Sequence, residues 1–234
     1  MIEIMVVIAI LAILLSLAIP SFSDSLRRSR VDSYVDQLAS SIRLARAEAM
    51  SRNKRVVICP TASDGAKYDS SGAAQANAIV CLSSGNAWAS GWAVFVDDGA
   101  GLASASGNGD WDQGEEILNH YAGPYANSYQ FYLMGLAADG SVDAQRHNLT
   151  FSPRGQAGYV DSNRYALGSF FAVGCHDDDI GESGRNVRGF SIERSGRLAM
   201  AQHDNSDGSA QRVNLADNSG GGSATSTVLE CSNT

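Results

Sequence analysis

An uncharged apolar run over residues 4–19 constrains this chain more than any other feature of its sequence. The run contains a single hydroxyl group, that of Ser16. A helix of this length is about 24 Å long, and residues 1–3 and 20–22 extend it toward the roughly 20 residues of a bilayer span. The sequence therefore predicts a helix that needs a membrane or other apolar helices around it.

The apolar run continues directly into an amphipathic segment, which indicates one long helix over about residues 2–52. Apolar side chains recur there at steps of three and four residues, as they do on one face of a helix: Val31, Val35, Leu38, Ile42, Ala45 and Ala49. Pro20 removes a backbone donor and clashes with the preceding turn, so we expect a bend near it. Residues 1–22 are expected to stay outside the head. Residues 23–234 are expected to form the head, including the amphipathic half of the helix.

The four cysteines Cys59, Cys81, Cys175 and Cys231 have none of the spacings that metal sites use. An even number beside a membrane anchor predicts two disulfides in an oxidising compartment, in preference to four free thiols in the cytosol. Three pairings are possible. Proximity in the sequence favours Cys59 with Cys81 and Cys175 with Cys231, and each pair would close a loop rich in Gly and Ser.

Charge is distributed unevenly along the chain. Residues 24–55 carry eight Lys or Arg against four acidic side chains, whereas residues 56–234 carry nine against twenty. Affinity for nucleic acid comes largely from Lys and Arg on phosphates, so the acidic head argues against nucleic acid as a partner.

Short apolar segments between loops rich in Gly, Ser, Asp and Asn predict an antiparallel β-rich head, and hence an α+β fold. The expected strands are 55–59, 78–82, 92–96, 116–121, 129–134, 148–152, 169–173, 189–194 and 197–201. The last two flank Ser195-Gly196, a pair typical of tight turns. Loops are expected over 62–77, 97–114, 135–146, 174–188 and 203–227.

The N-terminal residues Ile2-Glu3-Ile4-Met5-Val6-Val7-Ile8-Ala9, followed by Pro20, resemble the start of type IV pilins and type II secretion pseudopilins. In that superfamily prepilin peptidase cleaves a basic leader and the new N-terminus is methylated. Met1 falls about two residues inside the mature start of those proteins, so we expect the natural chain to begin further upstream.

The resemblance implies a mechanism of assembly. Glu3 matches the glutamate that pairs with the N-terminal amine of a neighbouring subunit. The apolar helix that begins at Ile4 and passes Pro20 then enters the filament core, and the heads face outward. The resemblance thus implies a single-pass inner-membrane protein with a periplasmic head, which later becomes part of an extracellular pilus.

Segments of the head resemble the GspH/FimT subgroup of the same superfamily. They are residues 44–49, 52–53, 56–59, 91–97, 114–118, 149–155 and 192–197. The resemblance implies a non-enzymatic, FimU-like minor pilin of the tip complex that primes pilus assembly and so serves twitching motility. Other minor pilins and the major pilin are its implied partners. The alternative is a GspH-like minor pseudopilin of a type II secretion system, and the four cysteines favour the pilus branch.

Two loops carry oxygen ligands without a complete metal-binding pattern. If Asn108 is the first position of a calcium loop, the required glycine falls late, at Gly114, and Asn119 replaces glutamate at the twelfth position. The acidic stretch after His176 has no second His or Cys spaced to share a metal. We therefore expect surface loops there, with no metal site and no cofactor.

The sequence contains no nucleophile elbow, phosphate-binding loop or HExxH helix, so no enzymatic activity is expected. A DNA-binding tip subunit is a lower-ranked alternative, because some FimT relatives bind DNA through a Gly-Arg-x-Arg motif. Here the matching residues are Gly196-Arg197-Leu198-Ala199, without the second arginine. Only a small basic patch that includes Arg194 and Arg197 would remain.

Overall fold

The computed structural model describes residues 2–61, 67–68, 74–75, 79–82, 87–99, 107–112, 114–123, 129–136, 142–143, 148–161, 164–176 and 188–200. The chain begins with the helix α1 (Ile2–Arg52), and a short 3-10 helix, η1 (Ala87–Ser90), follows in the head. The strands are β1 (Val56–Pro60), β2 (Lys67–Tyr68), β3 (Ala74–Gln75), β4 (Gly91–Val96), β5 (Ile117–Ala122), β6 (Tyr129–Leu136), β7 (Val142–Asp143), β8 (Leu149–Phe151), β9 (Ala157–Asp161), β10 (Arg164–Leu167), β11 (Ser169–His176), β12 (Arg188–Ile192) and β13 (Leu198–Met200).

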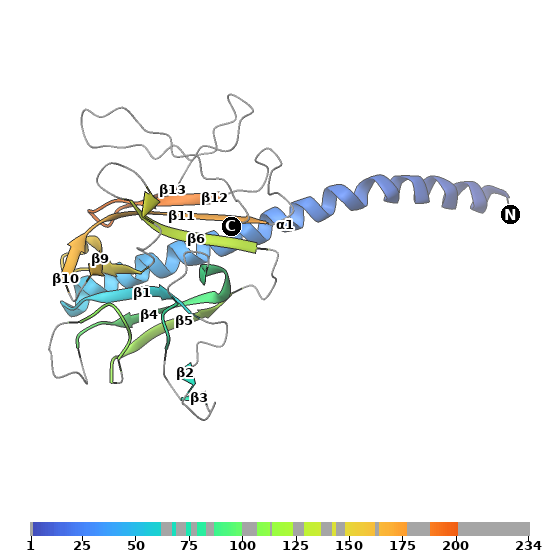
Figure 1. Ribbon diagram of the computed structural model, residues 1–234. Coiled ribbons are helices and arrows are strands. Elements are labelled where there is room, and N and C mark those ends of the chain that lie inside the picture. The colour runs from blue at the N-terminus through green and yellow to red at the C-terminus, as the bar shows by residue number, and fades with distance from the viewer. Residues whose placement is uncertain are drawn as a thin grey trace, which may run out of the picture.

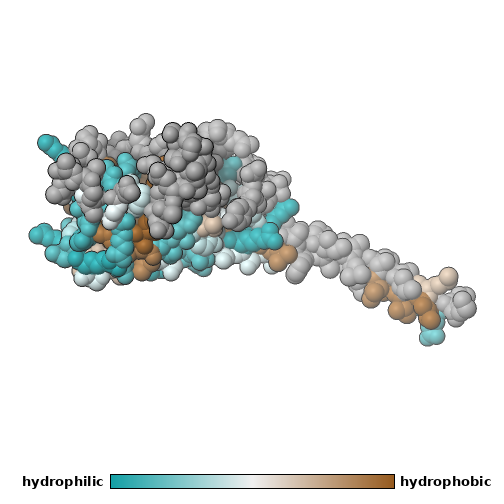
Figure 2. Space-filling view, turned by 90° about the horizontal axis from the view of Figure 1, so that it is seen from below, coloured by the Kyte–Doolittle hydropathy of each residue, from teal (hydrophilic) through white to brown (hydrophobic). Residues whose placement is uncertain are grey.

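The predicted long helix is confirmed as one continuous element. Its N-terminal part extends far beyond the head, while its C-terminal part lies within it (Figures 1 and 2). We call residues 2–22 the projecting segment and residues 31–52 the packed segment. Figure 1 shows the projecting part of α1 curving, and the helix is uninterrupted at Pro20. The helix ends where Asn53 adopts a left-handed conformation with φ of 54°, as residues that follow a helix C-terminus often do.

Two antiparallel sheets flank the packed segment (Figure 1), which confirms the α+β prediction. The first sheet has the strand order β10-β9-β8-β1-β4-β5, and the second has the order β13-β12-β11-β6-β7. The short strands β2 and β3 pair with each other. Strand β1 lies inside the first sheet, because its two edges pair with β4 and β8. The helix therefore enters the sheet through an immediate turn into one of its inner strands.

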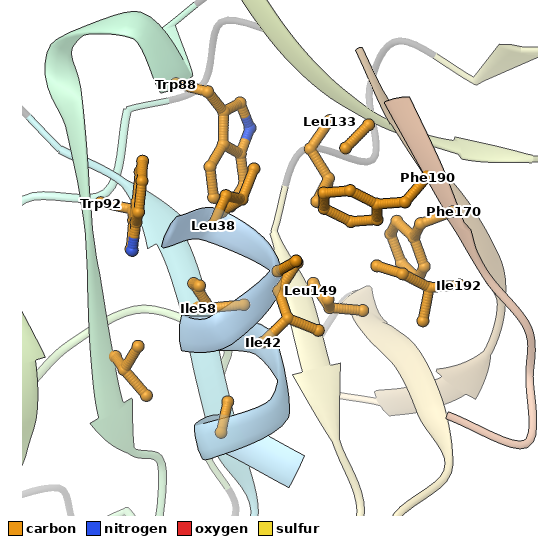
Figure 3. Packing of buried hydrophobic residues seen from close by; sticks show 14 of the residues in the cluster. Leu38, Ile42, Ile58, Trp88, Trp92, Leu133, Leu149, Phe170, Phe190 and Ile192 are labelled. Atoms are coloured by element: carbon orange, nitrogen blue, oxygen red, sulfur yellow. The ribbon is translucent and has the colours of Figure 1, made fainter. Parts of the chain in front are cut away.

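The hydrophobic core lies around the packed segment, between the sheets (Figure 3). Leu38 and Ile42 project from the helix into this core, where residues of both sheets surround them. The large buried side chains around them are Ile58, Trp88, Trp92, Leu133, Leu149, Phe170, Phe190 and Ile192. Each such side chain contributes about 1.5–3 kcal/mol when it is fully buried. The predicted apolar stripe of the helix is thus the central layer of the head.

Strand β1 is buried on both faces, because its side chains alternate between two clusters. Val56 and Ile58 face the main core, whereas Val57 and Cys59 join Phe95 in a smaller cluster on the other face of the sheet. Trp111 and Cys81 pack against that smaller cluster. The loop before β5 therefore covers the outer face of the first sheet.

The predicted disulfide between Cys59 and Cys81 is confirmed, with a Cα–Cα distance of 5.5 Å. Cys175 lies in β11. Cys231 lies outside the described residues, so its pairing with Cys175 stays a prediction.

The predicted strand over residues 78–82 is wrong, because only Cys81 pairs, in an isolated bridge with Thr61. On the edge of β1 opposite β4, strand β8 pairs with residues 56–58. The segment 79–82 therefore meets β1 only after residue 58, where the Leu82 amide donates to the Pro60 carbonyl. Strands β2, β3 and β7 lie in segments predicted as loops, and the β9–β10 hairpin was not predicted. The turn at Ser195-Gly196 is confirmed, with φ of 77° at Gly196.

Candidate functional site

The projecting segment exposes apolar side chains next to one carboxylate. Glu3 is exposed, and it is the only charged residue before Asp24. The apolar side chains described there are 54–71% exposed: Ile4, Met5, Val6, Val7, Ile10 and Leu11. Figure 2 shows this apolar surface at the far end of the helix, away from the head. Contiguous exposed apolar surface of this kind marks a contact with another protein or with lipid.

Over the residues that it describes, the structure contains no helix that is long and apolar enough to cross a membrane. Pro20 lies within α1, although its side chain, like those of residues 12–24, is outside the described part. The roles expected for Glu3, Ile4 and Pro20 in assembly stay predictions.

The packed segment holds the head through polar contacts as well as through its apolar stripe. The Tyr34 hydroxyl donates to the Trp88 carbonyl at 2.5 Å. Arg46 donates through Nε to the Gly155 carbonyl at 3.0 Å and through Nη2 to the Ser195 carbonyl at 3.1 Å. It thereby ties the helix to the β8–β9 turn and the β12–β13 turn at once. The sequence pattern placed Arg46 on the solvent face of the helix, and no periodicity signal identified this role.

A buried acidic site lies between β4 and β5, on the outer face of the first sheet. Asp97 directly follows β4 and is 1% exposed, and Glu115 is 5% exposed. The Asp97 Oδ2 atom accepts a hydrogen bond from the Gly109 amide at 3.2 Å. The two carboxylate oxygens of Glu115 accept from the Gly99 and Asp112 amides, each at 3.0 Å.

Burial governs the electrostatics of this acidic site. Burial raises the pKa of Asp97 to about 6, an effect that the Arg55 guanidinium, 4.0 Å away, partly opposes. Burial also raises the pKa of Glu115 to about 7, against the effect of its two amide donors. The predicted loop over residues 97–114 includes Asp97 but not Glu115, and sequence reasoning proposed neither as a site residue. No pattern in the sequence distinguishes these two carboxylates from the other acidic side chains of the head.

Within the described ranges, no group of three or more His, Cys, Asp or Glu side chains is gathered closely enough to hold a metal ion. His176 ends β11, and the acidic residues 177–179 after it lie outside the described part.

The residues of the candidate DNA patch, Arg194 and Arg197, are exposed around the β12–β13 turn. The nearby Arg188 forms an ion pair with Asp32 of the helix at 2.6 Å. Glu193 lies beside them and accepts a hydrogen bond from the Ser195 hydroxyl at 3.2 Å. The patch is therefore small and is interrupted by acidic side chains.

Comparisons with known proteins identify the family to which this chain belongs. A family model described as type II transport protein GspH matches residues 34–188. Two crystal structures of the type IV minor pilin FimU of Pseudomonas aeruginosa also match. One is 17% identical, covers 75% of this chain and 90% of that chain, and has a TM-score of 0.40. The other is 15% identical, covers 73% and 92%, and has a TM-score of 0.39.

No curated protein sequence matches the chain at a significant level. The family match runs from Tyr34 of the packed segment to Arg188, the first residue of β12, and so includes the whole first sheet and β6, β7 and β11 of the second. It covers more than half of the chain, which therefore belongs to the GspH family and is a minor pilin or pseudopilin.

Proposed function

We propose that the chain is a minor pilin that joins the tip complex of a type IV pilus and helps to prime its assembly. The exposed apolar side chains around Glu3 carry this proposal. A carboxylate at the centre of a bilayer costs about 2.5–3.5 kcal/mol on insertion scales, so an acidic residue in apolar surroundings favours a cationic partner. The N-terminal amine of a neighbouring subunit would supply that cation and fix the register of the two helices.

Before assembly, the projecting segment would hold the chain in the inner membrane, with its head in the periplasm. The Cys59–Cys81 disulfide supports this location, because such bonds persist in oxidising compartments. Maturation of the precursor by prepilin peptidase would precede assembly. The partners are then the other minor pilins and the major pilin.

A second candidate is a minor pseudopilin of a type II secretion system, which the description of the matching family favours. Both candidates use the same helix surface, so the two are separated by phenotype. Deleting the gene in its natural host should abolish twitching motility if the pilus proposal holds. Loss of protein secretion with normal twitching would instead assign the chain to the secretion system.

Replacement of Glu3 tests the assembly mechanism directly. Glu3→Ala removes the carboxylate and leaves the head untouched, so we expect its amount in sheared pili to fall well below the wild-type level. Immunoblots of sheared pili and of whole cells measure incorporation and expression separately. The head of the variant should keep its circular dichroism spectrum.

Glu116→Ala is the matched control, because it removes an exposed carboxylate from the head instead of from the helix tip. We expect this control to enter pili normally. Wild-type incorporation of Glu3→Ala would contradict the pairing mechanism.

A further inference from the structure

We propose that residues 107–112, which we call the strap, form a pH-sensitive cover over Asp97 and Glu115. The strap lies closed while these two carboxyl groups are protonated, and it lifts from the first sheet when they ionise. Both residues belong to the segment between β4 and β5, in the head and away from the projecting segment (Figure 1). The cover is therefore independent of the assembly mechanism proposed above.

The strap passes so closely over Asp97 that water can reach this carboxylate only if the strap moves. An added Cβ atom on Gly107 would collide with both carboxylate oxygens of Asp97. The Gly109 amide donates to Asp97 Oδ2 at 3.2 Å, whereas the buried Oδ1 atom has no hydrogen-bond partner among the described residues. An ionised carboxylate in this position lacks part of the hydration that it has in water, and lifting the strap restores that hydration.

Glu115 holds the strap from its other side. Its two carboxylate oxygens accept hydrogen bonds from the Gly99 and Asp112 amides, so the side chain joins the end of the strap to the residues that follow β4. The Trp111 indole Nε1 donates to the Glu115 carbonyl at 3.1 Å, and its ring packs against the smaller cluster around Phe95. Since Glu115 is buried as well, lifting the strap hydrates both carboxylates at once.

The charges around the two carboxylates do not balance when both are ionised. Asp97 and Asp112 both raise the pKa of Glu115, and Asp112 raises that of Asp97. Arg55 opposes them, because its Nε atom lies 4.0 Å from Asp97 Oδ2 and its Nη2 atom donates to the Gly107 carbonyl at 2.8 Å. One guanidinium group thus faces three carboxylates.

Other groups near the strap add no charge that changes over the same pH range. The Asn148 side chain, which is neutral, donates through Nδ2 to the Gly109 carbonyl at 3.4 Å. Lys54 forms an ion pair with Asp98 at 2.5 Å. Burial raises the pKa of Tyr165 in β10 further above its ordinary value of 10.0, so this residue stays neutral. The pH response of the strap therefore comes from the carboxyl groups.

The direction of the response follows from the pKa values of the closed state. Burial raises the pKa of Asp97 from 3.8 to about 6 and that of Glu115 from 4.5 to about 7. Once the strap has lifted, both groups return toward their ordinary values. The free energy that favours the closed strap is thus fully present below about pH 4, is lost as the pH rises toward about 7, and is constant above that.

Hydrogen exchange followed by mass spectrometry tests the proposal on the full chain in detergent. The exchange rate of a peptide containing residues 107–112 is divided by the intrinsic rate at each pH to give its protection. We expect this protection to fall by at least about tenfold between about pH 4 and 7, since one pKa unit corresponds to a factor of ten. Peptides from β11 should stay protected throughout, because the strap opens locally.

Variants assign the response to the two buried carboxyl groups. Asp97→Asn and Glu115→Gln should each reduce the fall in protection, and the double variant should keep the strap protected at every pH. Glu116→Gln, which changes the adjacent exposed carboxylate, should behave as the wild type does. Circular dichroism confirms that each variant is folded.

Three results would overturn the proposal. The first is pH-independent protection of the strap in the folded wild type. The second is a parallel loss of protection in β11, which would make the opening global. The third is a folded double variant whose strap is unprotected or still responds to pH as the wild type does.

Discussion

Glu115 is 5% exposed, and burial raises its pKa from 4.5 to about 7. The folded state therefore holds a proton on this carboxylate more tightly than the unfolded chain does. The stability that this contributes is complete below the unfolded pKa and is lost as the pH rises through the folded pKa. Burial of Asp97 also lowers stability as the pH rises, between about pH 3.8 and about pH 6.

Glu115→Gln should flatten the pH dependence of stability, because a neutral amide replaces the titrating carboxyl group. We expect the contribution of Glu115 to the free energy of unfolding of the wild type to fall between about pH 4.5 and 7. The variant should show a smaller fall, mostly below pH 6, owing to Asp97. Urea unfolding at a series of pH values measures both profiles. Glu116→Gln should keep the wild-type slope, and parallel profiles for wild type and Glu115→Gln would refute the role of Glu115.

At the residue scale, the sequence identified what depends on local pattern and missed what depends on distant contact. The Cys59–Cys81 pairing was predicted, because the two residues are close along the chain. The contacts of Arg46 with two turns were not, since those turns lie more than 100 residues away in the sequence. The burial of Asp97 and Glu115 was equally invisible, because a polar loop gives no sign of what it packs against.

At the element scale, apolar periodicity predicted α1 and most strands of the two sheets. The β9–β10 hairpin was missed because β10 is an edge strand with exposed or partly exposed side chains, so it lacks an apolar run. The segment 78–82 was wrongly predicted as a strand from its apolar residues. Those residues do not reveal whether a sheet edge is free to pair with the segment. Edge pairing and edge availability are properties of the assembled sheet.

Ile42→Ala tests whether the packed segment is the central layer of the head. Ile42 is 1% exposed among residues of both sheets, so its truncation should lower the free energy of unfolding by about 2–5 kcal/mol. Arg43→Ala changes the next, exposed residue of the same helix and should shift the value by less than about 0.5 kcal/mol. Urea unfolding monitored by tryptophan fluorescence measures both. If Ile42→Ala cost less than about 1 kcal/mol, close to the effect of a surface substitution, the sheets would have to pack on each other without the helix.

At the scale of the whole molecule, α1 serves two environments along one continuous helix. From Val31 to Ala49 one stripe of its apolar side chains is buried in the head, whereas the apolar side chains described from Ile4 to Leu11 are exposed. The contacts of α1 with the sheets involve β1, β4, β8, β11 and β12. Folding of the head and association through the projecting segment should therefore be separable properties of the chain.

Deletion of residues 1–24 tests that separation. The truncated chain keeps all the side chains of α1 that are buried among the described residues, from Val31 to Ala49, so we expect its free energy of unfolding to stay within about 0.5 kcal/mol of the full-length value. It also loses the exposed apolar surface around Ile4, so it should be a monomer in buffer without detergent, where the full chain should associate. Sedimentation velocity and urea unfolding measure the two properties on the same samples. A truncated chain that fails to fold would show that the projecting segment belongs to the core of the head. A truncated chain that associates as the full chain does would show that another surface drives association.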